Sequence, residues 1–188
     1  MPAPAKTSDA AILVAARRIL EAHGLGALTM QAVADAVGVR PPSLYKRFEG
    51  REALLAALES DTLARLGAML GEAALGRAPL AALEAQAHAF RRFARENPHA
   101  YAQIYAPEAT RGVEVDAARR DAVAPALEAL AALVGAGRAL AAARTLTAYL
   151  HGFVSIENAG LFRLGGDVDE AFRAGIELIL RGIETGDA

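Results

Sequence analysis

The 188-residue sequence contains no cysteine and no tryptophan, and its only lysines are Lys6 and Lys46. Without cysteine this sequence can form no disulfide, no thiolate zinc site and no cysteine nucleophile. Hydrophobic residues make up 54% of it and charged residues 22%, which is too apolar for an intrinsically disordered chain. Length and composition together predict one domain or two small ones around a sizeable core.

Neither sign of charge dominates, because 20 Lys and Arg residues stand against 22 Asp and Glu residues, a formal net charge of -2. The chain as a whole therefore lacks the strongly basic character common among nucleic-acid-binding proteins. Positive charge is local instead. Residues 1–55 carry seven basic and five acidic side chains, a net charge of +2, and Arg40–Arg51 alone carries four basic and one acidic, a net charge of +3.

Targeting and membrane signals are weak. Residues 1–6 lack the apolar core of a signal peptide. The longest apolar stretches, such as residues 122–137, are interrupted by proline and glutamate and fall short of the ~20 residues that cross a bilayer. We therefore expect a cytoplasmic protein with no membrane partner.

Apolar residues recur at the 3.6-residue period of a helix throughout, and nowhere does a β-branched run alternate long enough to predict a strand. An all-α protein is expected. Ser8 and Thr29 are candidate N-caps, and Asp167 with Glu170 resembles a capping box. The expected helices cover residues 8–23, 29–38, 41–45, 51–70, 80–96, a short piece around 101–105, 116–134 with Pro125 as either a kink or the true start, 138–163 and 168–184.

The most informative stretch is Leu28–Leu55, which predicts two short helices joined by a tight turn at Gly38. This is the arrangement in which a second helix can enter the major groove of DNA. Five apolar side chains would hold the two helices together: Val33, Val37, Val39, Leu44 and Phe48. The polar residues left facing outward would be Arg40, Pro41, Ser43, Lys46 and Arg47.

This stretch contains, at fixed spacing, Leu-Thr, Val-Ala, Gly-Val, Leu-Tyr, Phe and Ala-Leu-Leu. Their pattern resembles the N-terminal domain of TetR-family transcriptional repressors, and the resemblance extends over about residues 8–58. The resemblance implies a helix-turn-helix DNA-binding domain at 1–55 and a larger helical effector-binding and dimerisation domain at 56–188. His151-Gly152 also resembles the Trp-His-Gly mark of one subgroup, with Leu150 in the place of the Trp.

The resemblance also implies roles for single residues in binding a double-stranded DNA operator. Thr29 would be the N-cap of the second helix, Gln31 a phosphate or base contact, and Tyr45 and Arg51 phosphate contacts. The residues that would face the major groove are Arg40, Pro41, Pro42, Ser43 and Lys46. Arg40 could read a base or bind a phosphate. The alternative is that Tyr45 and Phe48 are core aromatics and the arginines a solvated face.

For the larger domain the resemblance implies a homodimer and a pocket for a small apolar or amphipathic effector. The candidate lining residues are Phe90, Phe93, Tyr101, Tyr105, His151, Phe153, Asn158 and Phe162, with His88 as a further polar anchor. Each aromatic could equally be ordinary core. The last two helices are expected to form the dimer contact, with Ile179 on the contact face.

No catalytic motif accompanies these features. The sequence has no Gly-x-Ser-x-Gly and no Walker-type loop, and its single Glu96-x-x-His99 is interrupted by Pro98, so no metal and no cofactor are expected. The favoured function is a ligand-responsive DNA-binding regulator, most simply a repressor, although an activator would have the same sequence features. A helical enzyme, or a carrier of a cofactor or ligand, is the alternative.

Overall fold

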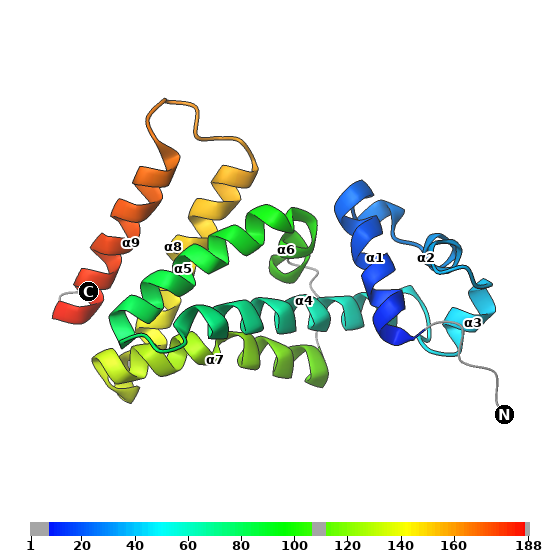
Figure 1. The fold of residues 1–188 in the computed structure, drawn as a ribbon, viewed down its shortest axis with the longest axis horizontal. Helices are drawn as coiled ribbons and strands as arrows, with labels where there is room; N and C mark the ends of the chain where they lie inside the picture. The colour runs from blue at the N-terminus through cyan, green and yellow to red at the C-terminus, as the bar shows by residue number, and fades with distance from the viewer. Residues whose placement is uncertain (1–7, 107–111, 187–188) are drawn as a thin grey trace. The chain divides into compact units, whose positions relative to one another are not determined.

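The computed structural model describes residues 8–106 and 112–186, and all regular secondary structure in these two ranges is helical (Figure 1). The predicted all-α class is confirmed. Residues 1–6, which bear on the expected localisation, lie outside the described ranges. The elements are α1 (Asp9–His23), the 3-10 turn η1 (Leu25–Ala27), α2 (Met30–Ala36), α3 (Pro41–Tyr45), α4 (Arg51–Ala74), α5 (Pro79–Glu96), α6 (Pro98–Tyr105), α7 (Val113–Val134), α8 (Ala136–Asn158) and α9 (Val168–Thr185).

The three predicted side-chain caps are confirmed. The Ser8 hydroxyl accepts a hydrogen bond from the Ala11 amide at 3.2 Å, and the Thr29 hydroxyl accepts one from the Ala32 amide at 3.1 Å. At the start of α9 the Asp167 carboxylate accepts two, from the amides of Asp169 and Glu170. Each cap satisfies amides that have no partner within the helix, which is why these helices begin where the sequence indicated.

Some helix boundaries differ from the prediction. The helix expected to run to residue 163 ends at Asn158, because Gly160 adopts a left-handed conformation (φ +65°) that continues no helix. In contrast, α4 continues past Gly71 to Ala74, and α7 begins at Val113, so Pro125 lies inside the helix instead of starting it. The short turn η1 was not predicted. None of the described helices is long and apolar enough to span a membrane.

The chain forms two compact units. The first contains the described residues up to 64 together with 97–106 and 112–119, and the second contains 65–96 and 120–186. The expected boundary between residues 55 and 56 falls within α4, and the division into domains 1–55 and 56–188 remains a prediction.

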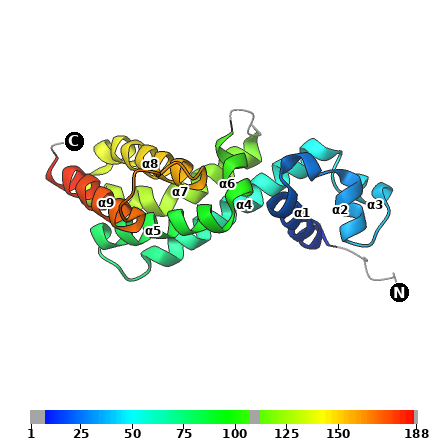
Figure 2. The ribbon, with the colours of Figure 1, turned by 90° about the horizontal axis from the view of Figure 1, so that it is seen from above.

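In the first unit α1 packs against α2, η1 and α6, and α2 packs against α3 (Figure 2). Its core contains Ile12, Leu20, Leu28, Leu44 and Leu54, each no more than 1% exposed. Burial of one such side chain stabilises the fold by about 1.5–3 kcal/mol, so the short helices α2 and α3 are held by packing and not by their own propensity.

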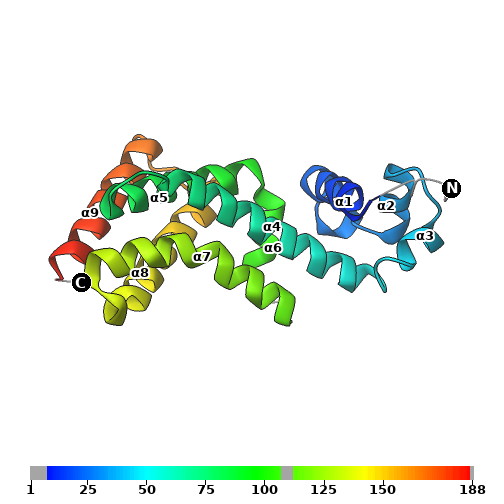
Figure 3. The same cartoon turned by 60° about the horizontal axis from the view of Figure 1, so that its bottom comes forward.

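In the second unit α5 packs against both α8 and α9, and α8 packs against α9. Apolar residues of α9 that recur at the helical period face this core, since Phe172, Ile176 and Ile183 are at most 2% exposed. The segments of α4 and α7 that belong to this unit lie side by side (Figure 3), and at Gly67 they approach so closely that a Cβ would lie 2.8 Å from the Cα of Ala122. Glycine at position 67 therefore allows this helix contact.

Candidate nucleic-acid interface

The turn between α2 and α3 has the geometry that the sequence predicted. Gly38 has φ +70°, a conformation that favours glycine, and the next amide, of Val39, donates to the Ala34 carbonyl at 3.0 Å. This bond closes the end of α2 and redirects the chain into α3. Ala34 itself is fully buried, as expected for a small residue where two helices cross.

The second helix of the pair, α3, begins with two prolines, which fit there because amides in a first turn have no helical partner. Leu44 is buried on its inner side, whereas Pro42, Ser43 and Lys46 are exposed on the other. Tyr45 is 54% exposed. Phe48, in contrast, is half-buried against the core of the first unit. The core interpretation therefore holds for Phe48 and fails for Tyr45.

The residues predicted at the start of α2 are both exposed and both already engaged within the unit. The Thr29 hydroxyl accepts the capping hydrogen bond described above and can still donate its own hydrogen. The Gln31 amide nitrogen donates to the Asp35 carboxylate at 2.8 Å. That nitrogen carries a second hydrogen, so Gln31 can donate to a phosphate oxygen while it stays bonded to Asp35.

The four basic residues of Arg40–Arg51 are not equivalent. Arg47 forms an ion pair with Asp9, which neutralises part of the local charge. Arg51 donates from Nε to the Leu28 carbonyl at 2.8 Å and from Nη2 to the Leu25 carbonyl at 2.9 Å, so it fastens the start of α4 to η1. Arg40 and Lys46 are exposed and have no ion pair within the described part of the chain.

The eight residues predicted to line an effector pocket do not fall in one unit. Tyr101 and Tyr105 lie on α6 in the first unit with ring centroids 5.0 Å apart. Tyr101 is buried, and burial raises the pKa of Tyr105 to about 12 despite the opposing effect of the Arg119 charge. The other six residues, Phe90, Phe93, His151, Phe153, Asn158 and Phe162, belong to the second unit.

Within the second unit these six residues have different surroundings. Phe90 and Phe93 are at most 5% exposed, and burial lowers the pKa of His151. The Phe153 ring packs at a tilt against Phe162, with ring centroids 4.8 Å apart, and edge-on against Phe172, with centroids 5.1 Å apart, although Phe162 follows α8 instead of lying on it. The exposed Asn158 donates to the Ala94 carbonyl at 3.2 Å.

Gln86 is a buried polar residue of the second unit that the sequence did not predict as a site residue. Gln86 on α5 is 3% exposed, its amide nitrogen donates to the Leu70 carbonyl at 3.4 Å, and its Oε1 has no hydrogen-bond partner within the described residues. A buried acceptor without a partner costs about 1–3 kcal/mol. Gln86 stands three residues after Leu83 and four before Phe90, so a polar residue on an apolar helix face was the available signal.

The helices α2 and α3 are joined at a glycine turn, and α3 has one buried face and one face open to solvent. This arrangement defines a helix-turn-helix module, and the rest of the described chain is also helical. Residues 12–58 match a family model described as bacterial regulatory proteins, tetR family, and residues 83–179 match the tetracyclin repressor-like C-terminal domain. The chain belongs to the TetR family of transcriptional regulators. Its class is therefore a transcription regulator and not an enzyme, which removes the enzyme alternative.

Similar proteins agree with this assignment. The chain is 32% identical over 160 residues to an uncharacterized HTH-type transcriptional regulator of Mycobacterium tuberculosis, covering 84% of this chain and 73% of that protein. The structure of a protein with unknown function from Rhodococcus sp. RHA1 has a similar fold, with 27% identity and a TM-score of 0.79, covering 95% of this chain and 97% of the other. A single-substitution variant of TetR from Acinetobacter baumannii AYE, solved in complex with minocycline, has 25% identity and a TM-score of 0.72, covering 97% and 99%.

Proposed function

We propose that the protein is a homodimeric repressor that binds a near-palindromic operator through α3 and is released by a small-molecule effector. The observation that carries the DNA-binding part is the solvent-facing side of α3, where Pro42, Ser43 and Lys46 are exposed over a buried Leu44. A two-fold symmetric dimer presents two such helices, and its operator would repeat the half-site with inverted symmetry.

The proposed contacts divide by chemistry. Arg40, Pro41, Pro42, Ser43 and Lys46 would face base edges, where a guanidinium can bind guanine O6 and N7 and apolar atoms can contact a thymine methyl group. Tyr45, Thr29, Gln31 and Arg51 would contact the backbone, and the charges of Arg40 and Lys46 would also neutralise phosphates beside the groove. Arg51 would do so while keeping its carbonyl contacts, through its remaining N–H groups.

We place the dimer contact on the outer sides of α8 and α9. Leu178 is 75% exposed and Ile156 on α8 is 42% exposed, which leaves apolar surface for a partner. Ile179, expected on the contact face, is instead half-buried beside the apolar stripe of α9. The helical period places Leu178 about 100° away from it, so Leu178 is the better residue to test.

The effector is proposed to be small and apolar or amphipathic and to bind in the second unit, where Phe90, Phe93 and Phe153 supply apolar surface and His151 and Asn158 polar groups. The unsatisfied Oε1 of Gln86 adds an acceptor for a ligand hydroxyl or amide. Tyr101 and Tyr105 of the first unit remain candidates by sequence alone. An effector that releases DNA must bind the DNA-free state more tightly than the DNA-bound state. We place this function in the cytoplasm.

Selection of bound duplexes from a random library tests the proposal. The expected product is an inverted repeat, and fluorescence anisotropy on it should give an affinity that falls steeply as salt rises. Enrichment of no sequence, or of a single unrepeated half-site bound by one chain, would contradict the proposed dimeric operator recognition. A duplex with one half-site scrambled is the matched control and should bind much more weakly.

A further inference from the structure

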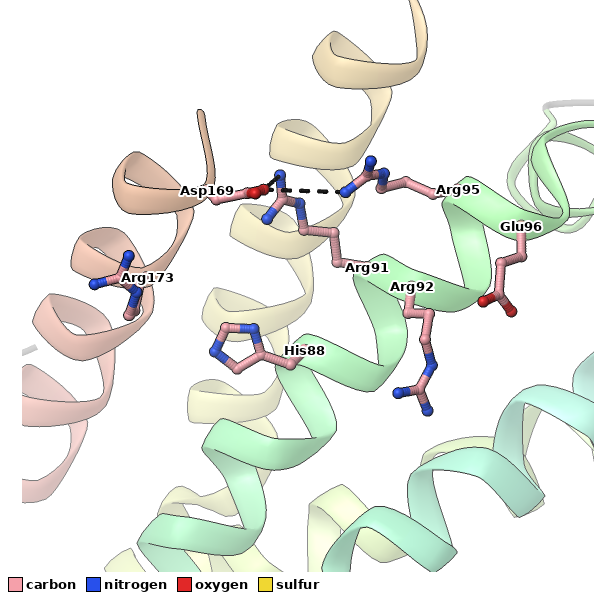
Figure 4. Close-up of a pocket in the computed structure, with 7 residues that line it drawn as sticks. All are labelled: His88, Arg91, Arg92, Arg95, Glu96, Asp169 and Arg173. Carbon is pink, nitrogen blue, oxygen red and sulfur yellow. Dashed lines mark ion pairs between the residues drawn. The ribbon is translucent and has the colours of Figure 1, made fainter. Parts of the chain in front are cut away.

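We propose that a cleft between α5 and α9 binds a small oxyanion with two or more negative charges, a dicarboxylate or a phosphate ester. The cleft lies entirely in the second unit and has a volume of about 620 Å³, within the range of small-molecule sites (Figure 4). Its lining residues are His88, Arg91, Arg92, Arg95 and Glu96 from α5 and Asp169 and Arg173 from α9.

Positive charge dominates this cleft. Four arginines line it against the two carboxylates of Glu96 and Asp169, so the lining carries a net charge of +2 with His88 neutral. Glu157, which pairs with Arg91 from α8, lowers the sum to +1. In a chain with a formal charge of -2, four guanidinium groups around one cavity set it apart from the average surface.

Arg91 is held in place and anchors the site. Its side chain is 8% exposed, it donates to both Glu157 carboxylate oxygens at 2.8 and 2.6 Å, and its Nη2 lies 2.6 Å from Asp169. The guanidinium also lies over the rings of Phe172 and Phe153, at 4.7 and 5.6 Å from their centroids. With its partners and position fixed, Arg91 holds the Asp169 carboxylate at one end of the cleft.

The other three arginines are available to a ligand. Arg95 is 56% exposed and lies 4.0 Å from both Glu157 and Asp169, too far for a strong hydrogen bond. Arg92 and Arg173 have no ion pair within the described part of the chain. Because each guanidinium can donate two parallel hydrogen bonds to a carboxylate or a phosphate, these residues suit an oxyanion better than a neutral ligand.

The helical period explains how the site is built. His88, Arg91, Arg92 and Arg95 recur at i, i+3, i+4 and i+7 and therefore share one side of α5. In Figure 4 Arg91 and Arg95 extend toward Asp169, and Arg173 projects from α9 on the far side of the cleft from His88. On α9 Arg173 is about 140° from Leu178, so the cleft stays accessible when the proposed dimer surface is covered.

This site differs from the proposed effector pocket, because none of the eight predicted lining residues borders it; of the residues predicted for that pocket, the further polar anchor His88 is the one that does. Its test needs no DNA, so it can fail or succeed independently of the proposed function. Isothermal titration calorimetry at 150 mM NaCl would use succinate, citrate, glucose 6-phosphate and inorganic phosphate, with succinamide and glucose as uncharged controls. We expect saturable binding of one or more anions, one per chain, and none of the controls.

Which of the four anions binds most tightly identifies the chemical class of the ligand. Preference for succinate or citrate indicates a carboxylate ligand, and preference for glucose 6-phosphate or phosphate indicates a phosphate ester. Failure of all four anions to bind, or equal heat from succinate and succinamide, would overturn the proposal.

Matched variants locate the binding. Arg173→Gln should weaken it by roughly tenfold, the usual effect of losing one charge-assisted hydrogen-bonding partner. Arg181→Gln makes the same charge change about 12 Å along α9, outside the cleft, and should leave the affinity within about twofold. Asp169→Asn removes a competing carboxylate and should strengthen binding about two- to threefold, whereas Glu184→Gln should not. Equal effects of Arg173→Gln and Arg181→Gln would refute the site. Arg173 is exposed, so its variant should fold normally.

Discussion

The substitution Tyr45→Phe gives a sharp test of the proposed DNA interface, because it removes one hydroxyl and leaves the ring. Tyr45 is 54% exposed, and its neighbour Leu44 carries the burial that holds α3 in place, so the fold should be unchanged. A hydrogen bond to a charged group such as a phosphate contributes about 1.5–3 kcal/mol. A dimer makes the contact twice, so operator affinity should fall by about 3–6 kcal/mol, or roughly 150- to 25,000-fold.

Fluorescence anisotropy with the selected operator and with an unrelated duplex, each over a range of salt concentrations, separates the possible causes. A phosphate contact carries no sequence information, so Tyr45→Phe should weaken binding to both duplexes by similar factors. The hydroxyl is uncharged, so the slope of log affinity against log salt should not change. Lys46→Gln provides the contrast, since losing one cation per subunit should reduce that slope by about two. Unchanged affinity, or a loss on the operator alone, would refute a phosphate contact by Tyr45.

Three further predictions concern assembly and stability. Leu178→Glu should convert the dimer to a monomer in sedimentation equilibrium, whereas Leu164→Glu, at a fully exposed loop residue, should not; a dimeric Leu178 variant would place the contact elsewhere. Asp167→Ala should lower the free energy of unfolding by about 1 kcal/mol in urea titrations, and no change would mean that the cap contributes nothing. Because the pKa of Tyr105 is raised to about 12, the folded form keeps this phenol neutral while the unfolded chain ionises it above pH 10. Stability should therefore fall between pH 10 and 12, and Tyr105→Phe should remove that part of the decline; an unchanged profile would contradict the burial argument.

The parts of the fold that sequence predicted are those with local causes. Thr29 caps α2 through an amide three residues away, and Gly38 turns the chain by its own backbone conformation. The predicted end of α8 was wrong, although its cause is also local. The apolar period continues as far as Phe162, whereas the backbone at Gly160 had already ended the helix. A glycine after a helix and a glycine at a close helix contact look alike in sequence, and only the backbone conformation distinguishes them.

The site residues depended on contacts distant in sequence. Tyr105 resembles Phe90 by chemistry, yet the two belong to different units. The arginine cleft also depends on such contacts. The spacing of the arginines on α5 is visible in the sequence, but the sequence does not show that Arg173 of α9 lies across the cleft from them. Residue type and spacing can place groups on one helix face, whereas the partner of that face is decided by packing between helices.

Only part of the positive charge of Arg40–Arg51 is available to bind DNA. Of the four basic residues that give Arg40–Arg51 its charge of +3, Arg47 is paired with Asp9 and Arg51 donates to two backbone carbonyls. Arg40 and Lys46 are the residues most available to replace counterions on DNA, two per subunit and four per dimer. At about 0.9 per phosphate neutralised, the salt slope should be near -4 if these two act alone and near -5 if Arg51 also reaches phosphate. A measured slope therefore counts how many of the four cations contact DNA.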